Sequence, residues 1–222
     1  MVSDDPKSVG LDAELHAYLV AHGSPPDAVL VDLAERTRDR FGDAARMQIS
    51  AEQGALLTLL VRITGARRVV EVGTFTGYSS VCLARGLPED GHLLCCDVDA
   101  TFTALAREAW DAAGVADRVE LRLGPAADTL RSLPTDRWID LSFIDADKAG
   151  YATYFEELVA RTRPGGLVCI DNVLWGGAVV DPADTSPDTE AIRAFNARVA
   201  ADDRVEVVML PVADGLTLAR VR

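Results

Sequence analysis

The chain has 222 residues, 49% of them hydrophobic, a length and composition typical of one large α/β domain. Its formal net charge of −13 repels the phosphates of nucleic acids and of anionic membranes, so we expect neither as a partner. The sequence has no run of about 18 apolar residues, so it predicts no membrane-spanning helix. Residues 1–10 are polar and acidic and lack the layout of a signal peptide, which favours a cytoplasmic protein.

The first 65 residues predict helices. Residues 11–21 form one candidate, and Pro25 and Pro26 open a second with apolar residues at helical spacing. Ser50 is expected to cap a third helix over Ala51–Thr64, which has one apolar face. We therefore expect a single domain, residues 1–222, in which a helical extension (1–65) precedes the core (66–222).

From residue 66 onward, short apolar strands alternate with helices of about 10–15 residues, which is typical of a parallel sheet covered on both faces. A turn through Asp214 and Gly215 joins the last two strands, and so short a connection requires an antiparallel pair. We thus expect an α/β fold with a doubly wound, mostly parallel sheet and an antiparallel strand near one edge. The predicted strands are 68–72, 92–97, 119–123, 139–144, 166–171, 205–210 and 216–221, and the predicted helices are 78–85, 103–113, 126–133, 151–163 and 190–201.

Ligands of such sheets bind at the carboxyl ends of the strands, near the switch in strand order. The first predicted strand ends in a turn in which Gly73 and Gly77 allow a close approach to a ligand, and the next helix offers free N–H groups. The second strand ends at Asp97, where a carboxylate can accept both hydroxyls of a ribose; Asp99 is less suited because it precedes a helix. These features indicate a nucleoside-containing cofactor without distinguishing S-adenosylmethionine from NAD.

Acidic clusters follow the next two strands of the predicted sheet. Asp145 comes directly after the fourth strand, and Asp171 and Asn172 lie at the end of the fifth. Because the ends of parallel strands lie side by side, these three side chains can present oxygen atoms to one point. Oxygen ligands with open water positions suit Mg²⁺, and also Ca²⁺ or Mn²⁺. The three histidines of the chain lie elsewhere in the sequence.

Three runs carry a resemblance to a known family: E-V-G-T-F-T-G-Y-S (71–79), F-I-D-A-D-K (143–148) and I-D-N-V-L-W (170–175). They resemble the cation-dependent, S-adenosylmethionine-dependent O-methyltransferases of the caffeoyl-CoA and catechol type. The runs M-Q-I-S-A-E-Q-G (47–54) and L-P-V-A-D-G-L (210–216) fit the same family. The similarity covers roughly residue 46 to the C-terminus, and it implies a Rossmann-like class I methyltransferase fold.

The resemblance also implies roles for individual residues. Lys148 matches the candidate base of the family, with Asp145 as the second catalytic residue. Plant enzymes of the family carry an asparagine after the tryptophan at position 175, whereas this chain has Gly176, so their substrate is not carried over. The implied cofactor-binding residues are Met47, Ile49, Glu71, Gly73, Thr74, Phe75, Ser79, Asp97, Ala126 and Asp145. The implied metal ligands are Asp145, Asp171 and Asn172, and the implied substrate-binding residues are Asp147, Lys148 and Trp175.

The implied reaction is methylation of one hydroxyl of an aromatic ortho-diol by in-line displacement. The metal chelates both diol oxygens and lowers the pKa of the attacking hydroxyl. Lys148 removes the proton if burial and the cation depress its own pKa; the alternative is a surface lysine that pairs with Asp147. Two other functions remain open: a nicotinamide-dependent oxidoreductase, although the chain has no G-x-G-x-x-G motif, and a non-catalytic cofactor-binding protein.

Two further expectations concern partners. We expect a homodimer, because the resemblance implies one and symmetric dimers are the commonest oligomers. We also expect a free catechol to be preferred over a coenzyme A thioester, whose phosphates need clustered cations. The candidate cations for those phosphates are Arg36, Arg38 and Arg40. The same segment contains Asp32, Glu35 and Asp39, so we expect these arginines to form a salt-bridged surface instead.

Overall fold

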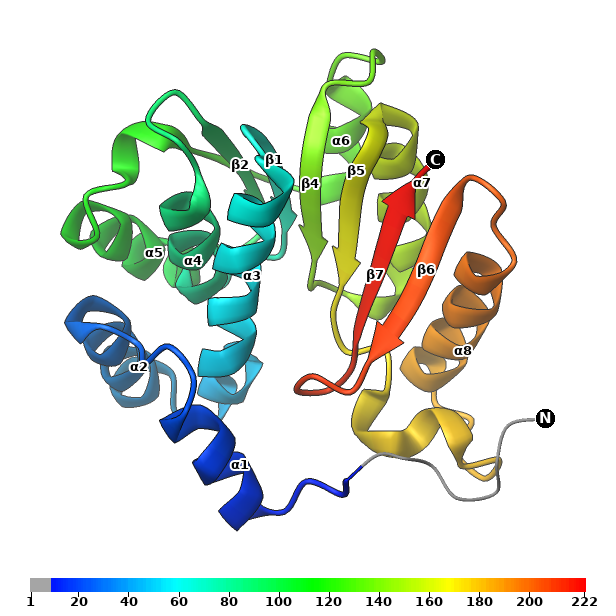
Figure 1. Cartoon of the computed structure of the whole chain (residues 1–222), viewed down its shortest axis with the longest axis horizontal. Helices are drawn as coiled ribbons and strands as arrows, with labels where there is room; N and C mark the ends of the chain where they lie inside the picture. Colours follow the sequence, from blue (N-terminus) through cyan, green and yellow to red (C-terminus); the bar gives the residue numbers. More distant parts are fainter. Residues whose placement is uncertain (1–8) are drawn as a thin grey trace.

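The computed structural model describes residues 9–222 and contains a seven-stranded sheet (Figure 1). Its strand order is β3-β2-β1-β4-β5-β7-β6, with parallel pairing from β3 to β5 and β7 antiparallel to both of its neighbours. This confirms the expected doubly wound, mostly parallel α/β sheet with an antiparallel strand next to one edge. The strands are β1 Arg68–Val72, β2 His92–Asp97, β3 Val119–Leu123, β4 Ile139–Ile144, β5 Thr162–Ile170, β6 Val205–Leu210 and β7 Leu216–Val221.

Helices cover both faces of this sheet and also precede it (Figure 1). The α-helices are α1 Ala13–Ala21, α2 Ala28–Phe41, α3 Ala51–Thr64, α4 Tyr78–Gly86, α5 Ala100–Ala112, α6 Ala126–Ser132, α7 Tyr151–Arg161 and α8 Pro187–Ala200. Short 3₁₀ segments occupy Gly42–Met47, Ala116–Arg118, Lys148–Gly150 and Trp175–Val180. Within residues 9–222, none of the helices is long and apolar enough to span a membrane.

The main difference from the predicted elements lies at the junction of α7 and β5. The sequence predicts a helix to residue 163 and a strand from 166, whereas α7 ends at Arg161 and β5 begins at Thr162. Pro164 has no N–H for a helical hydrogen bond and disfavours helical backbone at the residue before it, so the chain becomes extended earlier. Helices α5 and α8 begin at Ala100 and Pro187, where 103 and 190 are predicted.

The side chains of the central strands alternate between two cores. Alternation with a period of two is the geometry of a strand that is covered on both faces. All four cysteines of the chain are buried free thiols within these cores. The core on the side of α3, α4 and α5 receives Val69, Leu93, Cys95, Leu141, Phe143 and Cys169, and the core on the side of α6, α7 and α8 receives Val70, Val72, Leu94, Cys96, Ile144 and Ile170.

The N-terminal helices bring a further segment to the end of the sheet. Leu33 of α2 is buried, and the Thr37 hydroxyl donates a hydrogen bond of 3.0 Å to Thr76 Oγ1 in the turn after β1. This contact joins α2 to the glycine turn, and residues 42–50 lead from α2 into α3. Helix α1 buries none of its residues, and residues 1–8 of the expected extension lie outside the described part of the chain.

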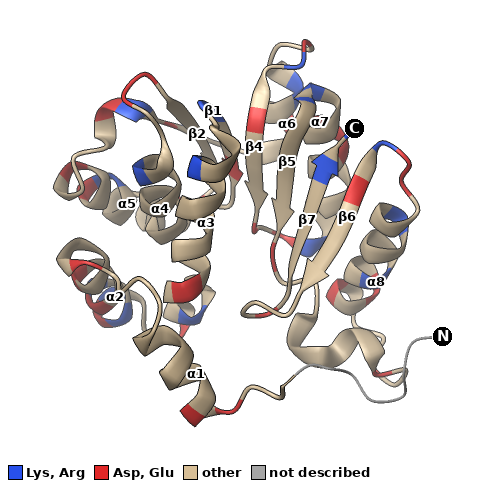
Figure 2. Cartoon of the chain, viewed as in Figure 1, with Lys and Arg blue, Asp and Glu red and all other residues tan. Residues whose placement is uncertain are grey.

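Charges of both signs are mixed on the surface helices, as α2 shows in Figure 2. Arg36 lies 3.6 Å from Asp32 and also pairs with Glu108 of α5, while Arg40 lies 3.5 Å from Glu108. These ion pairs confirm the expected salt-bridged surface for two of the three arginines. Arg38 has no acidic partner within the described residues, and it lines a small cavity of about 430 Å³ with Ala34, Gly42, Asp43, Ala45, Arg46 and Gln48.

Candidate active site

A large cavity of about 1150 Å³ is lined by residues that follow the carboxyl ends of β1, β2, β4 and β5. It lies next to the switch in strand order between β1 and β4. The segment before α3 and the turn before β7 also line it. Every residue predicted from the sequence to form the site lines this cavity except Glu71. Those that do are Met47, Ile49, Gly73, Thr74, Phe75, Ser79, Asp97, Ala126, Asp145, Asp147, Lys148, Asp171, Asn172 and Trp175.

The glycines of the turn after β1 are explained by contacts within the protein. Gly73 has φ +89°, and a Cβ atom there would lie 1.8 Å from the carbonyl oxygen of Asp145. Gly77 has φ +93°, and a Cβ atom there would lie 2.9 Å from the Cα atom of Ala106. Both positions therefore exclude a side chain, because the backbone of Asp145 or of Ala106 lies in the space that a Cβ atom would occupy. The sequence correctly marks them as sites of close approach, but the groups approached here are Asp145 and α5.

Asp97 holds the same turn together. Its Oδ2 atom accepts hydrogen bonds of 2.8 Å from the backbone N–H groups of Thr74 and Phe75, and its Oδ1 atom accepts one of 2.8 Å from Asp99 N. A carboxylate has about four acceptor sites, so about one remains for a ligand hydroxyl. The predicted contact with both ribose hydroxyls stays a prediction. Asp99 caps α5, because its side chain accepts hydrogen bonds from the backbone N–H groups of Thr101 and Phe102.

Glu71 lies behind the cavity. Its side chain is fully buried, and within residues 9–222 neither carboxyl oxygen has a hydrogen-bond partner. Burial raises the pKa of Glu71 to about 7, although the nearby Ser79, Cys95 and Thr74 side chains act to lower it. The structure therefore places this acid beside the glycine turn but away from the cavity surface, and its predicted contact with a cofactor stays a prediction.

Lys148 is the centre of the polar cluster after β4 and β5. Its ammonium donates hydrogen bonds of 2.5 Å to Asn172 Oδ1 and 2.7 Å to the Tyr151 hydroxyl, and it lies 3.6 Å from Asp145 Oδ1. The side chain is only 8% exposed. Asp147 instead accepts a hydrogen bond of 2.5 Å from the Tyr154 hydroxyl. The alternative of a surface lysine that pairs with Asp147 is therefore wrong.

The predicted metal ligands belong to this cluster. Asp145 and Asn172 both reach Lys148, while Asp171 Oδ1 accepts a hydrogen bond of 2.7 Å from Asn172 N. Within the described residues, no three His, Cys, Asp or Glu side chains converge in a geometry that could hold a metal. The predicted set does not need such a triad, because its third oxygen comes from the Asn172 amide.

Burial dominates the electrostatics of the cluster. It raises the pKa of Asp145, against the opposing charge of Lys148, and it raises the pKa of Asp171 to about 7, with the Asp145 charge adding to the rise. It also lowers the pKa of Lys148, against the charges of Asp145 and Asp171. Two buried acids and one lysine thus share a site in which additional positive charge would stabilise both carboxylates.

The Trp175 segment forms one wall of the cavity. Its turn requires positive φ at Trp175, Gly176 and Gly177, and the Asp214 carboxylate fixes it by accepting a hydrogen bond of 2.6 Å from Gly176 N. The Trp175 ring lies 5.3 Å from Lys148 Nζ. The sequence prediction missed Asp214 as a site residue, although the L-P-V-A-D-G-L run that contains it could have pointed to it.

Comparisons with known proteins agree with this geometry. The sequence profile of the O-methyltransferase family matches residues 21–222. Caffeoyl-CoA O-methyltransferase 2 of Zea mays is 42% identical over 185 residues, which are 78% of this chain and 70% of that protein. Catechol O-methyltransferase domain-containing protein 1 of Mus musculus is 39% identical over 212 residues, which are 94% of this chain and 80% of that protein.

A solved structure with the same fold contains a bound cofactor. The O-methyltransferase TomG of Streptomyces achromogenes, involved in tomaymycin synthesis and solved in complex with S-adenosylmethionine, superposes with a TM-score of 0.84 at 36% sequence identity. The match covers 94% of this chain and 96% of that one. The profile, the relatives and the shared fold confirm the resemblance found in the sequence. The chain therefore belongs to the family of S-adenosylmethionine-dependent O-methyltransferases.

Proposed function

We propose that the protein methylates one hydroxyl of an aromatic ortho-diol, with a divalent cation at Asp145, Asp171 and Asn172. Mg²⁺ is the first choice of cation, and Ca²⁺ and Mn²⁺ are the alternatives. The observation that carries this proposal is the convergence of Asp145 and Asn172 oxygens on the Lys148 ammonium, at 3.6 and 2.5 Å, within the cavity at the strand ends. The family relationship supports methyl transfer, and this cluster supports the diol and the cation.

The cavity fits S-adenosylmethionine in its chemistry. The cofactor carries positive charge on its sulfonium and ammonium groups, and Glu71 supplies a buried carboxyl with no hydrogen-bond partner among residues 9–222 beside the glycine turn. Asp97 keeps about one acceptor site for a ribose hydroxyl. The helix after the turn, α4, begins at Tyr78 and directs its free N–H groups toward the same end of the sheet.

The oxygen cluster fits a hard divalent cation. Two carboxylates and one amide carbonyl are the ligand types that Mg²⁺ and Ca²⁺ prefer, and two of the three already reach a positively charged group. When bound, such a cation would orient both oxygens of the diol and lower the pKa of the attacking hydroxyl. The donor set therefore agrees with the cation that the sequence predicts.

The chain's own residues supply the rest of the chemistry. In its neutral amine form, Lys148 accepts the hydroxyl proton, and burial favours that form by lowering the pKa of the ammonium. When bound, S-adenosylmethionine would supply the methyl group, and cleavage of its C–S bond would balance the new O–C bond to the acceptor. Trp175 provides an aromatic wall for the acceptor ring, and the buried setting excludes water from a reaction that neutralises charge.

A screen of diols tests the proposed function. We expect catechols incubated with the protein, S-adenosylmethionine and Mg²⁺ to gain a single methyl group, detected by mass spectrometry. Resorcinol is the matched control, because its two hydroxyls are placed too far apart to chelate one cation. Equal rates of methylation of resorcinol and catechol would show that the reaction does not depend on chelation of both hydroxyls. If neither compound is methylated, the protein does not act on simple diols.

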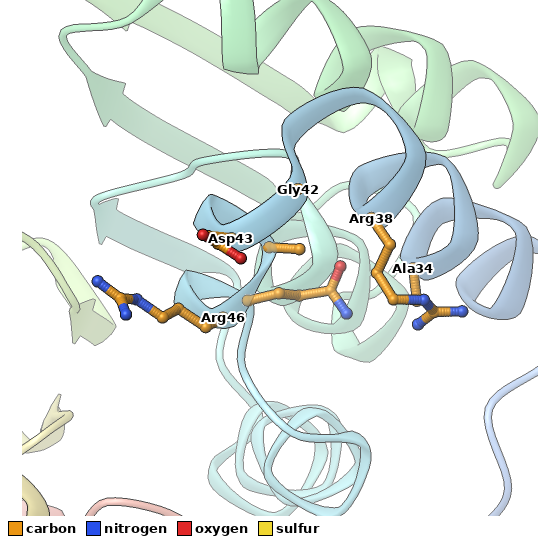
Figure 3. A pocket seen from close by; sticks show the side chains of 7 residues that line it. Ala34, Arg38, Gly42, Asp43 and Arg46 are labelled. Carbon is orange, nitrogen blue, oxygen red and sulfur yellow. The ribbon is translucent and has the colours of Figure 1, made fainter.

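The charges around the site also predict a preference among acceptors. Arg36 and Arg40 are engaged by acids, and Figure 3 shows the Arg38 and Arg46 side chains extending in opposite directions around the small cavity. Because Arg38 and Arg46 extend apart, these four arginines do not form one cationic cluster for the phosphates of coenzyme A. We expect kcat/KM for caffeic acid to exceed that for caffeoyl-CoA at equal Mg²⁺. A clear preference for the thioester would contradict this expectation.

A further inference from the structure

Gln53 is a buried amide that the proposed reaction leaves without a role. It lies in the first turn of α3, its side chain is 1% exposed, and it lines the large cavity. Neither Oε1 nor Nε2 has a hydrogen-bond partner in the described part of the chain. Buried amides in folded proteins are nearly always paired, so an unpaired one that faces a cavity calls for a specific explanation.

Packing prevents Gln53 from withdrawing from this position. The Ser50 hydroxyl caps α3 by accepting a hydrogen bond of 3.4 Å from Gln53 N. The next residue, Gly54, lies so close to α4 that a Cβ atom there would be 2.8 Å from Cys82 Sγ. The Thr58 hydroxyl donates a hydrogen bond of 2.8 Å to Cys82 O. The amide is therefore held at the cavity by a helix that is itself fixed against α4.

Gln53 and Asp171 line the same cavity. Burial raises the pKa of Asp171 and the charge of Asp145 adds to the rise, while the Gln53 amide and the Asn172 N–H act in the opposite direction. One oxygen of Asp171 already accepts from Asn172 N at 2.7 Å. The unpaired Gln53 amide and the Asp171 carboxyl thus share the wall of one cavity, and among residues 9–222 they do not complete a hydrogen bond.

We propose that Gln53 is a positioning residue for the divalent cation: its Nε2 atom donates a hydrogen bond to the Asp171 carboxylate and orients that carboxylate toward the cation. The inference rests on the proposed function, which makes Asp171 a ligand. Groups that hydrogen-bond to a ligating carboxylate fix its direction, and their loss weakens the affinity for the metal about 10–100-fold. Because Gln53 acts through Asp171, its loss should change cation binding before it changes cofactor binding.

Titration calorimetry with Mn²⁺ as the probe tests this inference, in the presence of saturating S-adenosylhomocysteine. We expect Gln53→Met to weaken Mn²⁺ binding about 10–100-fold. Binding of S-adenosylhomocysteine in the presence of a chelator should stay within about twofold of wild type, well below that loss. The thermal midpoint of the metal-free protein should not fall, because the variant removes an unpaired buried amide. A structural role alone would lower that midpoint.

Two further variants sharpen the test. Gln48→Met makes the same change at the other glutamine of the chain, which lines the same cavity and also carries a buried, unpaired oxygen within the described residues, and it should retain the wild-type affinity for Mn²⁺. Gln53→Asn keeps the amide but withdraws it by one methylene. It should therefore weaken Mn²⁺ binding without placing an apolar group beside Asp171, and it replaces Gln53→Met if that variant does not fold.

The outcomes separate the inference from the proposed function. Equal Mn²⁺ affinity in wild type, Gln48→Met and both Gln53 variants overturns the role of Gln53 and leaves the cation site standing. An equal loss of Mn²⁺ and S-adenosylhomocysteine binding in the Gln53 variants also overturns it, because the amide would then serve the cofactor. Absence of Mn²⁺ binding in the wild-type protein refutes the cation site itself, and the inference falls with it.

Discussion

Replacing Lys148 by methionine is expected to lower kcat about 10²–10⁴-fold, the range lost when a general base is removed. Methionine has nearly the same length but cannot accept a proton. Lys148 is buried against Asp145, Asn172 and Tyr151, so the variant also leaves Asp145 without its cationic partner. Affinity for S-adenosylmethionine should change much less, because the glycine turn and Asp97 do not depend on the lysine.

Lys148→Arg distinguishes a base from a positive charge. Arginine can restore the ion pair with Asp145, but it stays protonated in proteins and cannot take the hydroxyl proton. We therefore expect Lys148→Arg to regain thermal stability relative to Lys148→Met without regaining turnover. The measurements are kcat with a catechol and the thermal midpoint of each variant. Turnover near the wild-type value in Lys148→Arg would rule out proton transfer to this residue.

Gly73→Ala is expected to have the largest effect on stability. An alanine Cβ atom would lie 1.8 Å from the Asp145 carbonyl oxygen, so the ends of β1 and β4 would have to separate. That separation breaks the hydrogen bond of 2.8 Å from Asp145 N to Val72 O and displaces Asp145 from the site. Positive φ adds about 1–3 kcal/mol of backbone strain in alanine. We expect the free energy of unfolding to fall by more than about 4 kcal/mol, which is exceptional for one substitution.

Gly114→Ala is the matched control for this substitution. Gly114 also has positive φ, at +65°, but a Cβ atom there would meet nothing within 4 Å. It should therefore show only the backbone strain of about 1–3 kcal/mol. Chemical denaturation of both variants separates the two contributions, since their difference is the steric clash at Asp145. Equal losses of stability in the two variants would show that the contact at Gly73 is easily relieved.

The sequence was sufficient for the architecture and for the location of the site. Strands buried on both faces appear as short apolar runs, and the residues after each run must gather at one edge of a parallel sheet. For this reason Gly73, Asp97, Asp145 and Asn172 could be placed together without coordinates. The sequence also contains the signal that ends α7 earlier, because Pro164 disfavours helical backbone at Arg163.

The sequence did not predict which side chains contact one another within the site. Whether Lys148 meets Asp147 or Asp145 depends on the direction of the chain through the short 3₁₀ turn after β4, and both acids lie close to it in sequence. The arrangement of distant segments was equally hidden, such as the hydrogen bond from Gly176 N to Asp214 and the shared lining of one cavity by Gln53 and Asp171. These depend on how α3 and the turn before β7 pack against the strand ends, which no local pattern encodes.

We propose that methyl transfer depends on a divalent cation held by Asp145, Asp171 and Asn172. The most direct measurement is the initial rate of catechol methylation after exhaustive chelation, followed by addition of Mg²⁺, Ca²⁺ or Mn²⁺. We expect the rate to fall to the uncatalysed level after chelation and to recover with added cation in the wild type, whereas Asp145→Ala should show no recovery while still binding the cofactor. An undiminished rate after exhaustive chelation would show that methyl transfer needs no divalent cation.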